Sequence, residues 1–172
     1  ACGRGARTGR GGPGTGQKST GAARPGGISH AAGSLLLTLC DPETGVLLAP
    51  EVGSAAPRGW LAFHTGAPIV SAEQADFALG GWDALVPLDR FPIGTAEYPD
   101  RSTTLIVEVA GFDAPNATLS GPGIKDTAQM ALPDPVACAG NAMLYPLGVD
   151  FFFTTGSQVA ALPRSTQIRA EA

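Results

Sequence analysis

The sequence predicts an α/β domain with a mixed β-sheet flanked by helices. Segments of strand length and helix length alternate loosely along most of the chain. The sheet is expected to be organised around Val149–Thr154, a β-branched and aromatic run whose two faces are both largely apolar. Such a strand is expected inside a sheet, covered on both sides. Gly156 and Ser157 then suit a hairpin turn, and the chain returns as Val159–Leu162.

The other elements are predicted from apolar runs and from the Gly and Pro residues that interrupt them. In chain order, helices are expected at Ala31–Cys40, Pro57–His64, Trp82–Leu85 and Asp134–Leu144. Further strands are expected at Val46–Leu48, Pro68–Val70, Phe77–Leu79, Thr103–Ala110, Asn116–Ser120 and Ser165–Ala170. Within the second helix, Trp60, Leu61 and Phe63 are expected to point inward.

The N-terminal segment differs in composition from the rest of the chain. Residues 1–27 hold ten of the 24 glycines, five basic residues and no acid. We therefore predict a disordered Gly/Arg tail over residues 1–23 and one α/β domain over residues 24–172. The rest of the chain has 6 basic against 15 acidic residues, a formal charge of −9, which argues against a nucleic-acid-binding face.

Cysteine content and hydropathy indicate the cellular compartment of the protein. The three cysteines (Cys2, Cys40 and Cys138) are odd in number and far apart, which favours a reduced, cytoplasmic protein over a disulfide framework. No apolar run reaches the roughly 18 residues of a membrane span. The Gly/Arg start also lacks the apolar region of a signal peptide. We expect a cytoplasmic protein with no membrane association.

Two ligand-binding patterns in the tail are weak. Gly11–Thr20 resembles a phosphate-binding P-loop, but Gln17 separates the final Gly from Lys18, and no buried strand precedes it. Arg4, Arg7 and Arg10 could form an arm that grips single-stranded RNA. A flexible basic tail without a ligand is the preferred interpretation of both patterns.

The rest of the chain offers few groups for catalysis. It has two histidines (His30 and His64), no set of residues spaced like zinc ligands and no recognisable nucleophile–base pair. We therefore assign no catalytic, cofactor-binding or metal-binding residue. One lysine outside the tail, Lys125, could serve as a Schiff-base lysine.

Three residues remain as candidates for an interface or a function. His64 follows a predicted helix and precedes a Gly turn; the alternative role is a hydrogen-bonded histidine at the helix end. Asp150 could orient a partner's group, or it could be satisfied by backbone N–H groups. Arg164 could bind a phosphate oxygen, although a structural ion pair with Asp150 or Glu108 is favoured.

Six blocks of sequence follow one another along the chain: ARPGGI, SLLLTLCDPETGVLL, WLAFHTGAPIVSAEQADFAL, TTLIVEVAG, LSGPGI and PLGVDFFFTTG…ALPRST. In this order they resemble the PhnH family of the bacterial carbon–phosphorus lyase machinery. They extend from about Ala22 to Ala172. The chain departs from the family at its start, where the family has an amphipathic helix and this chain has Gly and Arg. The connection between ARPGGI and the first helix is also shorter.

The resemblance implies a fold like that of pyridoxal-phosphate-dependent transferases, without the cofactor. It implies a subunit of a complex with PhnG, PhnI and PhnJ, which forms alpha-D-ribose 1-methylphosphonate 5-triphosphate from ATP and methylphosphonate during phosphonate catabolism. The family's subunit is expected to be essential but non-catalytic, and to form a homodimer alone. Two alternatives stay open. One is a stand-alone pyridoxal-phosphate enzyme using Lys125; the other is an RNA-binding protein acting through its basic N-terminal arm.

Overall fold

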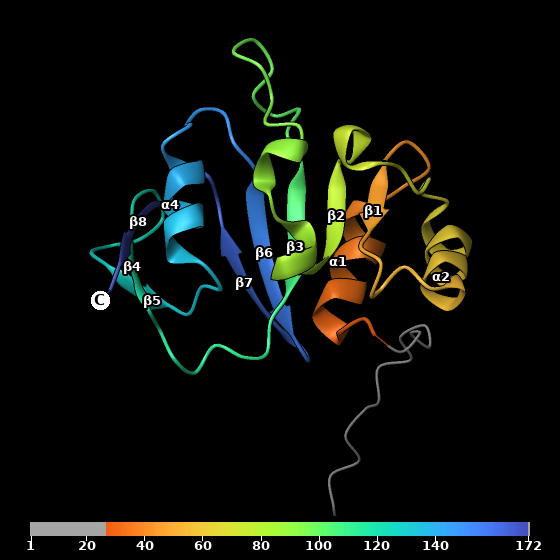
Figure 1. The fold of residues 1–172 in the computed structure, drawn as a ribbon, viewed down its shortest axis with the longest axis horizontal. Coiled ribbons are helices and arrows are strands. Elements are labelled where there is room, and N and C mark those ends of the chain that lie inside the picture. Colours follow the sequence, from red (N-terminus) through yellow and green to blue (C-terminus); the bar gives the residue numbers. More distant parts are fainter. Residues whose placement is uncertain (1–26, 172) are drawn as a thin grey trace, which may run out of the picture.

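The computed structural model describes residues 27–171. The predicted tail, the P-loop-like segment and the basic arm lie outside the described residues. Within them, the fold combines one mixed sheet, one smaller antiparallel sheet and helices (Figure 1). The predicted α/β class with a mixed sheet is therefore confirmed.

The larger sheet has five strands in the order β1-β2-β3-β6-β7. They are β1 (Val46–Leu48), β2 (Phe77–Gly81), β3 (Thr104–Glu108), β6 (Asp150–Thr155) and β7 (Gln158–Leu162). The first four run parallel to one another, and β7 pairs antiparallel with β6 across the tight hairpin turn. Gly156 in that turn has φ = 54°, a conformation that glycine adopts without strain.

Strand β6 has the central position that its sequence predicts. Its neighbours are β3 and β7, and Phe151 and Phe153 are buried beside Leu105 and Val107 of β3. The two phenylalanine rings stack with their centroids 5.7 Å apart. Phe152 points to the opposite face and is only half-buried. Leu79 and Ile106, which share the Phe152 face, are fully buried, so both faces of the sheet contribute to the core.

Helices lie on the two faces of this sheet. They are α1 (His30–Leu39), α2 (Ala55–Thr65), the single turn α3 (Trp82–Leu85) and α4 (Pro135–Ala142), with two 3-10 turns at Ala72–Gln74 and Leu88–Arg90. Helix α1 contacts β6 and β7 on the Phe152 face, while the Trp82 ring of α3 packs against Phe151 on the other face. The sheet is thus covered on both sides near its centre.

The smaller sheet has three antiparallel strands in the order β5-β4-β8. They are β4 (Ala117–Ser120), β5 (Ala128–Met130) and β8 (Gln167–Ala170). Figure 1 shows this sheet beside α4, which contacts β8. The predicted strand near Ser165–Ala170 exists, but it belongs to this second sheet. Strand β5 was not predicted, because Ala128 and Gln129 carry no β-propensity signal.

Two details of the prediction were wrong. The Phe63 side chain is 84% exposed rather than inward-facing. Phe63 lies two residues beyond buried Leu61, about 200° around the helix, and therefore points away from the core that Leu61 enters. The expected strand at Pro68–Val70 is reduced to one isolated bridge between Ile69 and Val46.

Candidate functional site

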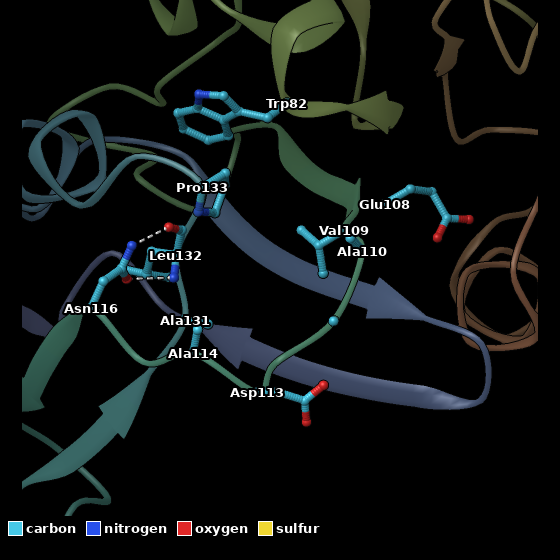
Figure 2. Close-up of a pocket in the computed structure, with 11 residues that line it drawn as sticks. Trp82, Glu108, Val109, Ala110, Asp113, Ala114, Asn116, Ala131, Leu132 and Pro133 are labelled. Carbon is cyan, nitrogen blue, oxygen red and sulfur yellow. Dashed lines mark hydrogen bonds between the residues drawn. The ribbon is translucent and has the colours of Figure 1, made fainter.

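A cleft of about 500 Å³ lies at the carboxyl end of β3. Trp82 directly follows β2, Val109 and Ala110 follow β3, and Leu132 and Pro133 precede α4. Figure 2 shows the Trp82 indole on one side and the Val109–Ala110 segment on another. The carboxyl ends of parallel strands are where open α/β sheets commonly bind ligands. This position makes the cleft the first candidate for a site.

The most prominent polar groups of the cleft take part in structural contacts. Glu108 is directed away from the Val109 side chain (Figure 2) and accepts hydrogen bonds from Ser29 N (2.7 Å) and from Thr154 Oγ1 (3.0 Å). Its carboxylate therefore ties the N-terminal end of α1 to the sheet. The Asn116 amide donates to Leu132 O (2.8 Å) and accepts from Leu132 N (2.8 Å), shown as dashed lines in Figure 2.

Few of the described residues that line the cleft carry a charged or reactive side chain. Asp113 is exposed and is the remaining charged side chain among the lining residues. Among residues 27–171, no lysine, arginine or histidine lines the cleft, so this part of the chain supplies no cationic side chain there for a phosphate group. The lining residues that the structure describes also include no cysteine, serine or threonine that could act as a nucleophile.

Asp150 and Arg164 form an internal ion pair. Arg164 Nη2 lies 2.6 Å from Asp150 Oδ2, and the two side chains are 13% and 30% exposed, respectively. Arg164 Nη1 also donates to Pro99 O (2.7 Å) and Gly148 O (2.9 Å), and Arg164 N donates to Asp150 Oδ1 (2.8 Å). The guanidinium thus joins three segments of chain. This geometry favours the structural interpretation of both residues over phosphate binding.

His64 lies apart from that pair. It is exposed near the end of α2, which precedes Gly66 with φ = 72°. Its imidazole packs beside Trp60 (5.2 Å between ring centroids) and Phe63 (4.9 Å, edge to face). Figure 1 shows α2, which carries His64, beyond the β1 edge of the larger sheet. Asp150 begins β6, and strands β2 and β3 lie between β1 and β6. The structure therefore does not bring the three candidates into one site.

The remaining candidates lie in unrelated places. Lys125 is exposed on the connection between β4 and β5 and does not line the cleft, so its position does not favour a buried Schiff base. Cys40 and Cys138 are buried free thiols, and burial raises the pKa of each to about 12. Among residues 27–171, no group of three His, Cys, Asp or Glu side chains is placed to hold a metal ion.

Known proteins resemble the chain over most of its length. A family model described as bacterial phosphonate metabolism protein (PhnH) matches residues 8–169. The chain belongs to the PhnH family. The family resemblance inferred from the six sequence blocks is therefore confirmed. In the described part of this PhnH-family chain, residues 27–171, no helix is long and apolar enough to cross a membrane.

Two curated relatives of this PhnH-family chain carry functional names. The alpha-D-ribose 1-methylphosphonate 5-triphosphate synthase subunit PhnH of Rhizobium meliloti (strain 1021) is 40% identical over 164 residues. That alignment covers 91% of this chain and 82% of the relative. The putative C-P lyase subunit protein HtxG of Stutzerimonas stutzeri is 35% identical over 111 residues, 60% of this chain and 55% of the relative.

Sequence reasoning did not single out the residues that shape the cleft. Trp82 was expected only as part of a helical turn, and Asn116 only as the start of a strand. For Trp82 the available signal was its position directly after β2, at the carboxyl end of a parallel strand, where α/β sheets commonly bind ligands. Pairing Asn116 with the Leu132 backbone needs a contact across 16 residues, which no local pattern predicts.

Proposed function

We propose that this chain is the PhnH subunit of an assembly that forms alpha-D-ribose 1-methylphosphonate 5-triphosphate from ATP and methylphosphonate. The observation that carries the proposal is 40% identity to a subunit of that synthase across 91% of the chain. The similarity to a putative C-P lyase subunit points to the same metabolism of phosphonates.

Within that assembly, the chain acts as an essential subunit that binds partners and supplies no catalytic group. Several contacts support this role. The Glu108 carboxylate and the Asn116 amide at the cleft have structural partners, and the Asp150–Arg164 pair is held within the fold. The partners are PhnG, PhnI and PhnJ-like subunits in the cytoplasm, and the chain forms a homodimer when alone. Its largely parallel sheet suits the proposed likeness to pyridoxal-phosphate-dependent transferases without the cofactor.

Reconstitution tests the proposal. Purified PhnG, PhnI and the accessory PhnL are incubated with ATP and methylphosphonate, with and without this chain, and the ribose phosphonate is followed by phosphorus NMR. We expect product when the chain is present, and neither product nor adenine release from the chain alone. If the other subunits make product equally well without the chain, the proposed function is wrong.

Single substitutions test the non-catalytic role. His64→Ala, Asp150→Asn and Arg164→Met are compared for assembly with the partners and for turnover. We expect activity to fall only as far as assembly falls. A variant that assembles normally but loses a hundredfold in rate, about 2.7 kcal/mol of activation barrier, would assign a reacting or positioning role to that residue.

A further inference from the structure

Helix α4 presents large apolar side chains to solvent. Val136 is 74% exposed and Met143, which follows the last residue of α4 with helical backbone angles, is 86% exposed. Val136, Gly140, Met143 and Leu144 are spaced by four, seven and eight residues, which places them on one side of the helix. We call these four residues the α4 face.

An apolar groove of about 450 Å³ runs beside the α4 face. Val86, Pro87, Leu88 and Ile93 form one wall, and Ala137 and Leu144 contribute to the other. Asn141 also lines the groove, but its amide is engaged with the Val149 backbone through two hydrogen bonds of 2.8 and 2.9 Å. Leu144 belongs to both the groove and the α4 face. The two features are therefore continuous.

The geometry of the α4 face suits another helix. A Cβ atom added at Gly140 would meet nothing within 4 Å, so the space above this part of the helix is open. Small residues of this kind let a second backbone approach closely, while flanking side chains such as Val136 and Met143 interdigitate with it. The eight residues of α4 extend over about 12 Å, which a partner helix of two or three turns would match.

Acidic side chains lie at and beside the groove. Asp89 is the one charged residue among the described residues that line it, and Asp134 caps the N-terminal end of α4 by accepting a hydrogen bond from Ala137 N (2.9 Å). Asp83 is exposed on α3, just before the Val86 wall. A helix flanked by Lys or Arg would complement this rim, since opposite charges steer association and set orientation.

A second copy of this chain fits the groove less well. It would present the same acidic residues, and like charges brought together across an interface are unfavourable. None of the four described α-helices has more than one Lys or Arg, and α1 and α4 carry no charged residue. The described part of the chain thus lacks the basic amphipathic helix that the groove favours.

We propose that the α4 face and its groove are the docking site for an amphipathic helix of another subunit, whose Lys- or Arg-bearing flank lies against Asp89 and Asp134. The apolar side of that helix fills the groove and covers Met143. The inference rests on the proposed function, because the partner is sought among the PhnG-, PhnI- and PhnJ-like subunits.

A matched pair of charge insertions tests the site. Met143→Glu and Phe63→Glu each place a carboxylate at a strongly exposed apolar position, on α4 and α2 respectively. Binding of each variant to the co-expressed PhnG, PhnI and PhnJ subunits is measured by interferometry, alongside thermal melting. We expect Met143→Glu to weaken binding at least tenfold and Phe63→Glu to match wild type. Unchanged binding by Met143→Glu overturns the proposal.

The charge of the occupant has its own test. Asp89→Lys is expected to weaken the same binding at least tenfold at low salt, with a smaller difference at high salt because charge interactions are screened. Binding that is unaffected, or strengthened, contradicts a basic flank and overturns the proposal.

Photo-crosslinking identifies the occupant even if a variant folds poorly. A benzoylphenylalanine at position 143 of the otherwise intact chain, assembled with the same subunits, should crosslink to a helical segment that contains Lys or Arg. A crosslink to a second copy of this chain, or none at all, overturns the proposal. If the wild-type chain binds the subunits but reconstitution yields no ribose phosphonate, the proposed function fails while the docking site is still tested.

Discussion

Strand β6 and helix α4 lie close together in the sequence, and both are rich in apolar side chains. The two elements differ in the solvent exposure of these side chains. Phe151 and Phe153 of β6 are buried, whereas Val136 and Met143 on or beside α4 are among the most exposed large side chains of the described residues. Apolar composition alone therefore does not show whether the side chains of a segment are buried in the core or exposed on the surface, where a partner could bind them.

The difference comes from the number of surfaces that each element contacts. Strand β6 is hydrogen-bonded to β3 and β7 at its edges and has side chains of the domain on both faces. Helix α4 uses its inner side, where Cys138 and Asn141 are buried, and leaves Val136 and Gly140 outside. The predictions below distinguish a face that stabilises folding from one that stabilises assembly.

The largest effect is expected for Phe153→Ala in β6. Its ring is fully buried, and removing a buried phenylalanine typically costs about 3–5 kcal/mol of unfolding free energy. Urea denaturation measures this cost, with Phe63→Ala on exposed α2 as the control, which should change stability by less than about 0.5 kcal/mol. Phe152→Ala should fall between them, because Phe152 is half-buried. Equal losses for Phe153→Ala and Phe63→Ala would refute the central placement of β6.

A smaller loss is expected for Arg164→Ala, which removes the ion-pair partner of Asp150 at the start of the same strand. The substitution removes donors to Pro99 O and Gly148 O and leaves the partly buried Asp150 carboxylate without its cation. We expect a cost of about 2–3 kcal/mol, below the range for fully buried pairs because Asp150 remains 30% exposed.

A control shows whether Arg164 acts through its specific partners. Arg101 is exposed and stacks over the Tyr98 ring at 4.3 Å, so Arg101→Ala should cost at most about 1 kcal/mol. A double-mutant cycle with Asp150→Ala should give a positive coupling for Arg164. A coupling energy of zero would show that Arg164 and Asp150 contribute independently to stability.

Much of the larger sheet was predictable because its signals are local. The apolar runs of β1, β2, β3 and β6 and the Gly156 turn each lie within a few residues. The second sheet was less predictable. Strand β8 pairs with β4 across about 50 residues, and β5 is short and mostly exposed, so neither pairing leaves a periodic pattern.

The candidate site was predictable only in part. The ion pair of Asp150 with Arg164 was anticipated as the structural alternative, since both residues flank one hairpin. The cleft was not anticipated, because Trp82, Asn116 and Leu132 come together from separate parts of the chain. The exposure of Met143 was also missed. A sequence pattern shows that a helix has an apolar side but not how many of its sides the fold covers.

The inner side of α4 gives a further prediction, on pH. Burial raises the pKa of Cys138 to about 12, whereas an unfolded thiol titrates near 8.5. Above that pH the unfolded chain releases a proton that the folded chain keeps, so stability falls as the pH rises toward 12. Unfolding free energies of Cys138→Ala between pH 8 and 10.5 should decline less steeply than those of the wild type. Parallel pH profiles would show that this thiol titrates alike in both states.

The smallest effect on stability is expected for Met143→Ala on the α4 face. Its side chain is 86% exposed, so little of its apolar area leaves water when the chain folds, and the unfolding free energy should change by less than about 0.5 kcal/mol. If a partner helix covers this methionine, the same truncation should weaken assembly by about 1–3 kcal/mol, the gain from burying a side chain of this size. Urea denaturation of the isolated chain and titration with the PhnG, PhnI and PhnJ subunits measure the two quantities on one variant. A loss in denaturation without a loss in binding would show that Met143 belongs with Phe153 as part of the fold, and the contrast between α4 and β6 would disappear.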